Sequence, residues 1–230
     1  MIRRGAILIA IACFGAIFAG MVADFTAPEG LRSLAAYYVR NVPAELGAPN
    51  VVTGILITYR GLDTIGEVAV LFVVAASVGL ILGKRARSEP DGEAASVRPV
   101  SELVETGANV LLPIILVFGA YLIANGHLSP GGGFQGGAIV ASAVMLLLLA
   151  RRDSSLDHGT LSVTESLAGV LYVSVGILGV VFAGGFLDSR ILPIGDLGAF
   201  VSAGAIPLVT VLLGLKVSAE LSVIIDRFRE

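Results

Sequence analysis

The chain has 230 residues, of which 56% are hydrophobic and only 14% are charged. Soluble domains carry about 25% charged residues, so this composition excludes an ordinary soluble domain and indicates an integral membrane protein. The net charge of −3 gives no basis for binding nucleic acid. The single cysteine, Cys13, excludes a disulfide framework and a cysteine-held metal cluster within the chain. We therefore expect no cofactor and no resident metal.

About 20 apolar residues are needed to cross a bilayer. Six runs meet this length, at about 5–23, 64–83, 106–125, 132–150, 166–187 and 197–216. They predict an all-α integral membrane protein with about six transmembrane helices. The first run follows Arg3 and Arg4 and also resembles a signal peptide, which is the alternative to a retained helix.

Two polar stretches separate these runs. Residues 24–50 predict a long outer loop, within which 30–42 forms a short interfacial helix. Residues 84–102 contain two prolines and mixed charges, so they predict a cytoplasmic linker between two helices and four helices. Basic residues gather before the first run, in this linker, after the fourth run and in the C-terminal tail. This positive-inside pattern places both termini in the cytoplasm.

Three ionisable residues interrupt the apolar stretch 51–83. Arg60, Asp63 and Glu67 are spaced i, i+3 and i+7, so on one helix they share a face. A charged group in a bilayer costs at least ~2.5 kcal/mol, and it is retained when it pairs, meets water or handles ions. Two carboxylates one turn apart can bind Na+ transiently or pass a proton between them. The alternative is an inter-subunit salt bridge at the outer interface.

A glycine-proline motif lies between the third and fourth runs, at residues 126–137. Pro130 ends one helix and can start the next, and the glycines after it permit unusual backbone angles. Two interpretations remain open: a packing turn, or a re-entrant segment beside an ion path in which His127 titrates near neutral pH. Two overlapping G-x-x-x-G pairs favour close helix packing. The motif residues are Pro130, Gly131, Gly132, Gly133, Phe134, Gly136 and Gly137.

Two further patterns predict structural roles. Ser162 and Glu165 fit a capping box before the fifth run. Lys216 and Glu220 fit an ordinary i, i+4 pair near the cytoplasmic end of the sixth run. No lysine is expected at the centre of a membrane helix, so the chain is not expected to transport ions by itself.

Two strings resemble known families. GHLSPGGGFQGGAIVASAVMLLLLA, residues 126–150, resembles the signature of the MnhB/MrpB family, small membrane subunits of Mrp-type cation/proton antiporters. TYRGLDTIGEVAVL, residues 58–71, resembles the C-terminal part of the large MrpA subunit, whose stand-alone equivalent is a two-helix subunit of membrane-bound hydrogenases. The resemblance implies a fusion of an MrpA-tail-like module (1–88), a cytoplasmic linker (89–98) and an MrpB-like four-helix module (99–230).

The resemblance also implies roles for matching positions. The acidic pair at Asp63 and Glu67 is implicated in antiport, and Pro130 and Phe134 matter for activity or assembly. Gln135 departs from the aliphatic residue of many MrpB sequences and looks more like the hydrogenase-associated branch.

The implied function is that of a non-enzymatic subunit of a Na+/H+ antiporter in a prokaryotic cell (inner) membrane. Its expected partners are large complex I-like antiporter subunits, small membrane subunits and lipid. The alternatives are the same module in an energy-converting hydrogenase or related respiratory complex, with hydrogenase-type partners, and a scaffold without ion contact.

Overall fold

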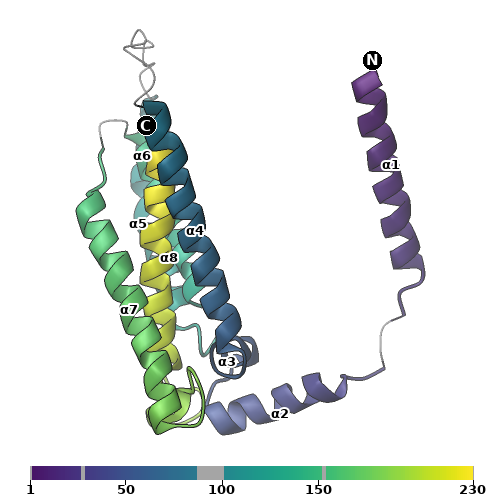
Figure 1. Cartoon of the computed structure of the whole chain (residues 1–230), viewed down its shortest axis with the longest axis vertical. Helices are drawn as coiled ribbons and strands as arrows, with labels where there is room; N and C mark the ends of the chain where they lie inside the picture. The colour runs from purple at the N-terminus through teal and green to yellow at the C-terminus, as the bar shows by residue number, and fades with distance from the viewer. Residues whose placement is uncertain (1, 27–28, 87–100, 152–153, 230) are drawn as a thin grey trace. The chain divides into compact units, whose positions relative to one another are not determined.

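The computed structural model describes residues 2–26, 29–86, 101–151 and 154–229, and the predicted linker at 89–98 lies outside these residues. Six of the described helices are long and apolar enough to cross a membrane, which confirms the prediction of an all-α, multi-pass membrane protein. These are α1 (Ile2–Ala23), α4 (Gly61–Ala86), α5 (Glu102–Ala124), α6 (Gly133–Ala150), α7 (His158–Phe182) and α8 (Ile206–Arg229) (Figure 1). The shorter elements are α2 (Ser33–Leu46), α3 (Val51–Gly54), the π-helix η1 (Ile55–Tyr59) and the 3-10 helix η2 (Ser189–Ile191).

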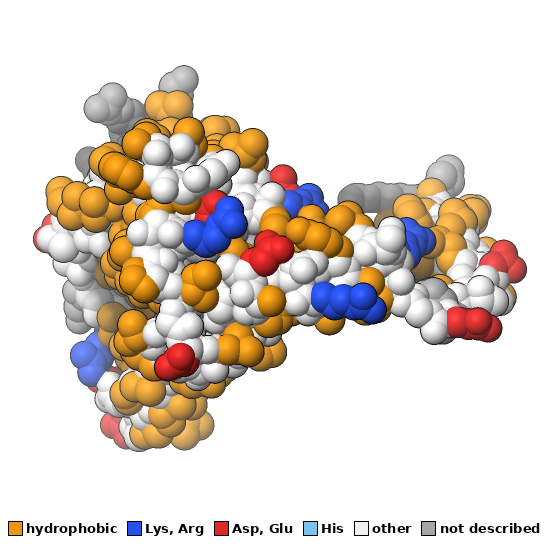
Figure 2. All heavy atoms as spheres, turned by 90° about the horizontal axis from the view of Figure 1, so that it is seen from below, with side chains coloured by type: hydrophobic (Ala, Val, Ile, Leu, Met, Phe, Trp, Pro, Cys, Tyr) orange, Lys and Arg blue, Asp and Glu red, His pale blue; other side chains and the backbone are white. Residues whose placement is uncertain are grey.

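The chain divides into two compact units, residues 1–37 and 38–230. The first contains α1, whose described residues are exposed apart from the half-buried Gly5. Helix α1 carries apolar residues on all of its faces, which suits a helix covered by lipid or by other membrane helices. Figure 2 likewise shows a face covered widely by hydrophobic side chains, with only scattered charged ones.

Helix α8 is the centre of the second unit. It contacts α4, α5, α6 and α7, and Figure 1 shows it among these four helices. More than half of its apolar stretch is buried, against none of the apolar stretch of α4. The core includes Val209, Leu212 and Leu213 of α8, together with Val42 and Leu46. Since Val42 and Leu46 are one turn apart and both buried, α2 continues past Pro43 instead of ending at residue 42 as predicted.

Asn50 joins two loops at one end of the second unit. Its side-chain amide donates hydrogen bonds to the backbone carbonyls of Gly126 and Ser129, each at 2.8 Å. Its backbone N–H donates to the carbonyl of His127 at 3.0 Å, and its side-chain oxygen caps α3. Asn50 therefore fixes the α5–α6 loop against the start of α3. The only sequence signal for this role is the capping pattern of an Asn that follows a proline, which our prediction did not include.

The ends of helices α7 and α8 differ from those predicted. The fifth run was predicted at 166–187, and α7 spans His158–Phe182. The sixth was predicted at 197–216, and α8 spans Ile206–Arg229. Residues 197–205 are apolar but form a loop, with Gly198 and Gly204 at φ values of 86° and 58°. The prediction was wrong because apolar loop residues raise hydropathy as much as helical ones do.

These new boundaries correct two smaller predictions. Asp157, not Ser162, caps α7, because its Oδ1 accepts hydrogen bonds from the backbone N–H groups of Gly159 at 3.0 Å and Thr160 at 3.3 Å. Lys216 lies near the middle of α8, not at its cytoplasmic end. Glu165 and Lys216 therefore both lie inside spanning helices.

Candidate functional site

The segment that carries the predicted ionisable cluster is broken. Helix α3 passes into the π-helix η1, the chain turns at Arg60 with φ −126° and ψ 36°, and α4 begins at Gly61. Arg60, Asp63 and Glu67 therefore do not share one continuous helix face. The guanidinium of Arg60 still pairs with the carboxylate of Asp63, and both side chains are well exposed, at 60% and 42%. This pair lies where α4 begins.

Thr64 connects α4 to the π-helix. Its hydroxyl donates a hydrogen bond of 2.8 Å to the carbonyl of Leu56. A break in a helix leaves backbone carbonyls without their usual partners, and a nearby threonine is one of the groups that satisfies them. Single π-helical turns often occur at functional sites. This hydrogen bond holds the bend and places Glu67, one turn after Thr64, beside the start of α6.

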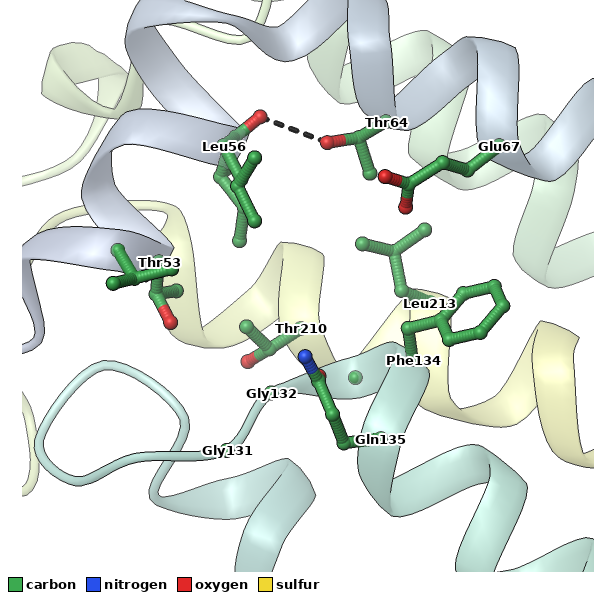
Figure 3. A pocket seen from close by; sticks show the side chains of 13 residues that line it. Thr53, Leu56, Thr64, Glu67, Gly131, Gly132, Phe134, Gln135, Thr210 and Leu213 are labelled. Atoms are coloured by element: carbon green, nitrogen blue, oxygen red, sulfur yellow. Dashed lines mark hydrogen bonds between the residues drawn. The ribbon is translucent and has the colours of Figure 1, made fainter. Parts of the chain in front are cut away.

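A cavity of about 60 Å³ lies where the two sequence motifs meet. Figure 3 shows the Glu67 carboxylate pointing from α4 toward Leu213 of α8 and Phe134 of α6. The lining residues are Val52, Thr53, Leu56, Ile57, Thr64, Glu67, Gly131, Gly132, Gly133, Phe134, Gln135, Thr210 and Leu213. A space of this size admits a few water molecules. Asp63 is not among the lining residues, so the structure brings Glu67 to the glycine motif and leaves Asp63 with Arg60.

The cavity offers one carboxylate and several neutral oxygens. Glu67 supplies the charge, while Gln135, Thr53 and Thr64 supply amide and hydroxyl oxygens. Hard cations such as Na+ bind such oxygen ligands. Among the described residues, no three His, Cys, Asp or Glu side chains gather to hold a metal ion. The arrangement offers oxygen ligands for transient contact with a monovalent cation or a proton.

The glycine motif forms one side of this cavity. Gly131 and Gly132 adopt φ values of 153° and 144°, which side chains other than glycine rarely adopt. The carbonyl oxygen of the Gln135 side chain lies 2.9 Å from where a Cβ on Gly132 would be. Gly132 lies just before α6, which begins at Gly133. The predicted Gly132–Gly136 pair is therefore wrong as a pair of packing positions within one helix. Pro130 is exposed in the loop before it.

Gly133 and Gly137 bring α6 close to α8. A Cβ on Gly133 would lie 2.7 Å from Cβ of Leu213, and one on Gly137 would lie 2.9 Å from the carbonyl oxygen of Gly214. Gly136 faces the other way, toward the carbonyl oxygen of Gly119 on α5 at 2.8 Å. These contacts agree with the packing interpretation of the motif, and the ion-path interpretation stays a prediction.

His127 lies outside the cavity. It is fully buried in the α5–α6 loop, where Nε2 is 3.1 Å from the carbonyl oxygen of Phe200. Its Nδ1 has no hydrogen-bond partner among the described residues. Burial lowers the pKa of His127 below its ordinary value, since the charged ring would lose its hydration. The structure thus places His127 in the core of the loop, beside Phe200.

The lowered pKa of His127 predicts that acid weakens the second unit. The unfolded chain binds a proton at this histidine below its ordinary pKa of about 6.5, whereas the folded chain resists it. Stability is therefore fully present above that pH and is lost as the pH falls below it. Thermal unfolding of the purified chain in detergent, followed against pH, should show a smaller acid loss in His127→Gln than in the wild type. An equal acid loss in His127→Gln and in the wild type would contradict this assignment.

Two family models match the chain. Residues 103–223 match the model described as a domain related to the MnhB subunit of Na+/H+ antiporter, and residues 1–99 match the model of MbhE, which is described as one of the subunits of MBH. An uncharacterized protein of Methanocaldococcus jannaschii is 31% identical over 196 residues, which cover 76% of this chain and 74% of that protein. A probable K(+)/H(+) antiporter protein of Rhizobium meliloti, named as its A/B subunit, is 30% identical over 171 residues, which cover 64% of this chain but only 16% of that protein.

Two solved structures share the fold. A chain of the membrane-bound sulfane sulfur reductase (MBS), an archaeal respiratory membrane complex, superposes with a TM-score of 0.81 at 36% identity, covering 99% of this chain and 98% of that one. A chain of the Mrp complex from Dietzia sp. superposes with a TM-score of 0.74 at 26% identity, covering 97% of this chain and 26% of that one. The MnhB-related model matches residues 103–223, more than half of this chain. The chain therefore belongs to the family of domains related to the MnhB subunit of Na+/H+ antiporters.

Proposed function

We propose that the chain is a membrane subunit of a multisubunit Mrp-type cation/proton antiport module and that it lines part of the ion path. The observation that carries this proposal is the composition of the Glu67 cavity. Glu67 and Thr64 come from the region that matches the MbhE model, whereas Phe134, Gln135 and Thr210 come from the MnhB-related region. One site built from both regions gives a physical reason for their presence in one chain. The names of the antiporter relative and of the Mrp neighbour support this function.

Glu67 is the residue that we assign to the ion. Its side chain is exposed on this chain while it also lines the cavity, so it can face the cavity and another protein of the complex together. A single carboxylate with neutral oxygens leaves a Na+ site incomplete. Other membrane subunits of the complex therefore supply the remaining ligands. The Arg60–Asp63 pair forms the rim at the start of α4.

The proposal includes an arrangement in the membrane. We place the chain in a prokaryotic inner membrane with both termini in the cytoplasm, on the basis of the distribution of its arginines and lysines. We also propose that residues 1–88 and 99–230 are two modules joined by a linker at 89–98. The two family models, which end at residue 99 and begin at residue 103, support this division.

A second candidate function is the same role in a redox-driven respiratory complex. The observation that favours it is the end-to-end superposition on a chain of the sulfane sulfur reductase complex, at higher identity than on the Mrp chain. In both cases this chain serves transport and does not carry the catalytic centre. Purification of the native complex in mild detergent separates the two candidates, because only the second predicts metal-cluster subunits among the copurifying proteins.

Replacing Glu67 by Gln tests the role in the ion path. We expect Glu67→Gln to lower cation-dependent proton flux in membrane vesicles by about tenfold or more, because losing a charge–ion contact worth ~1.4 kcal/mol already changes affinity tenfold. Glu105→Gln, at an exposed position of α5, is the matched control and should leave the flux unchanged. Normal flux with normal assembly in Glu67→Gln would refute the proposal. A lower yield of complex with unchanged coupling would favour a scaffold role.

A further inference from the structure

A second group of charged side chains lies inside the second unit, outside the Glu67 cavity. Lys216, one turn after Leu213 on α8, is only 7% exposed, and Glu220 is fully buried. The Lys216 Nζ atom lies 3.0 Å from Oε1 of Glu165 on α7 and 3.2 Å from Oε2 of Glu220. The ring of Phe72 on α4 is 5.8 Å from the same nitrogen. We call Lys216, Glu165 and Glu220 the α7–α8 triad.

The triad is unbalanced in charge. Two carboxylates and one ammonium carry a net charge of −1, and an uncompensated charge inside a protein costs several kcal/mol. One additional proton makes the triad neutral. Oε1 of Glu220 has no hydrogen-bond partner among the described residues, so a buried oxygen is free to carry this proton.

No other cation among the described residues is shown to compensate the triad. Helix α6 carries no charged residue, and the acidic Glu102 and Glu105 of α5 are exposed. On α4 the Phe72 ring faces Lys216, and Glu67 lies at the other cavity. The remaining charged side chains that the structure describes on α7 and α8 are His158, Asp226 and Arg227, which lie toward the far end of α8.

A hollow with both polar and apolar lining extends from the triad toward that end. Nε2 of His158, the first residue of α7, lies 3.0 Å from Oδ2 of the buried Asp226. His158, Ser162 and Glu165 are spaced i, i+4 and i+7 on α7, so they share one face. All three line this hollow of about 180 Å³, which also includes Arg227. The hollow has room for water, and His158, Ser162, Glu165 and Arg227 offer it hydrogen-bond partners.

We propose that the α7–α8 triad is a proton-binding centre of this chain, loaded from the hollow that His158 and Glu165 both line. In the binding step a hydronium ion in the hollow gives its proton to a carboxylate oxygen of Glu165 or Glu220, and an O–H bond forms as water is released. Lys216 remains an ammonium and holds the two carboxyl groups together. That the triad binds a proton does not depend on the proposed function. Only the use of this proton in antiport rests on it.

Tyr172 lies about two turns beyond Glu165 on α7, within the hydrophobic core. Its buried hydroxyl has no hydrogen-bond partner among the described residues. Tyr172 also interacts electrostatically with Glu67. The triad thus lies between the His158–Asp226 end and the side of the molecule that carries the Glu67 cavity.

Infrared difference spectroscopy tests the proton. The full-length chain in lipid nanodiscs is titrated with acid and base, and the carbonyl stretch that only protonated carboxyl groups show is followed. We expect one such band in the wild type, shifted in D₂O and abolished by a rise in pH. The band should be lost in Glu220→Gln or Glu165→Gln and retained in Glu105→Gln, a matched change at an exposed site.

The wild-type spectrum decides the proposal even when a variant fails to fold. Absence of a protonated carboxyl band throughout the titration, with the helical amide signal intact, would overturn it. A band that survives both triad substitutions would also overturn it. If the band behaves as expected but Glu67→Gln leaves flux in the native complex unchanged, then the proton site holds and the proposed antiport function fails.

Discussion

Lys216→Met should lower the stability of the second unit by about 3–5 kcal/mol, the usual effect of removing one partner from a buried ion pair. Methionine keeps much of the length of the side chain, so the packing against Phe72 is largely retained. The change instead leaves Glu165 and Glu220 close together without the ammonium group that lies 3.0 and 3.2 Å from their oxygens. Unfolding of the purified chain in mixed detergent micelles measures the loss.

A neutral triad provides the internal control for this prediction. The triple variant Lys216→Met, Glu165→Gln, Glu220→Gln removes every charge and should recover most of the lost stability, since buried ion pairs replaced as a whole are often neutral in effect. Arg40→Met removes an exposed cation and should change stability by no more than about 0.5 kcal/mol. If Lys216→Met were as stable as the wild type, the lysine would not be compensating buried carboxylates.

Gly133→Ala should destabilise the contact between α6 and α8 by about 1–3 kcal/mol, the usual cost of overpacking. The added Cβ would lie 2.7 Å from Cβ of Leu213 and 2.9 Å from the backbone nitrogen of Gly214. Neither of these atoms belongs to the flexible end of a side chain, so one helix must move. This movement would also displace Phe134 and alter the Glu67 cavity, so both stability and cation-dependent flux should fall.

Gly107→Ala is the matched control for this substitution. Gly107 lies within α5 and has no neighbouring atom within 4 Å of the position that a Cβ would take. Alanine there should raise stability by up to about 1 kcal/mol, because glycine is a poor helix former. Equal effects of the two substitutions, in the same micelle unfolding assay, would show that the space around Gly133 does not limit packing.

The six spanning helices were predictable because length and hydropathy are local properties of the sequence. The ends of α7 and α8 were not. Residues 197–205 are as apolar as a helix, whereas Lys216 and Glu220 look like residues at a membrane surface. Only their pairing with each other and with Glu165, 51 residues earlier than Lys216, makes their burial possible. A single sequence does not show which charges neutralise one another between helices.

The candidate site was predictable in its parts and not in its assembly. Glu67 was identified by its charge in an apolar stretch and the glycine motif by its composition, but nothing in the sequence says that they line one cavity. The π-helix at 55–59 and the turn at Arg60 place Glu67 there, and the apolar string ILITY carries no signal for them. Asn50, which fixes the α5–α6 loop, was missed because its hydrogen bonds reach residues 76 and 79 positions away.

The central position of α8 has a consequence for biogenesis. Helix α8 follows α4, α5, α6 and α7 in the chain, and it is the helix that all four contact. A protein is synthesised from its N-terminus, so these four helices enter the membrane before the helix around which they assemble exists. Until Lys216 has been synthesised and inserted, Glu165 has no ammonium partner, and until Leu213 has been inserted the Glu67 cavity lacks one of its sides. Until α8 has been inserted, these four helices therefore lack the packing partner that they share.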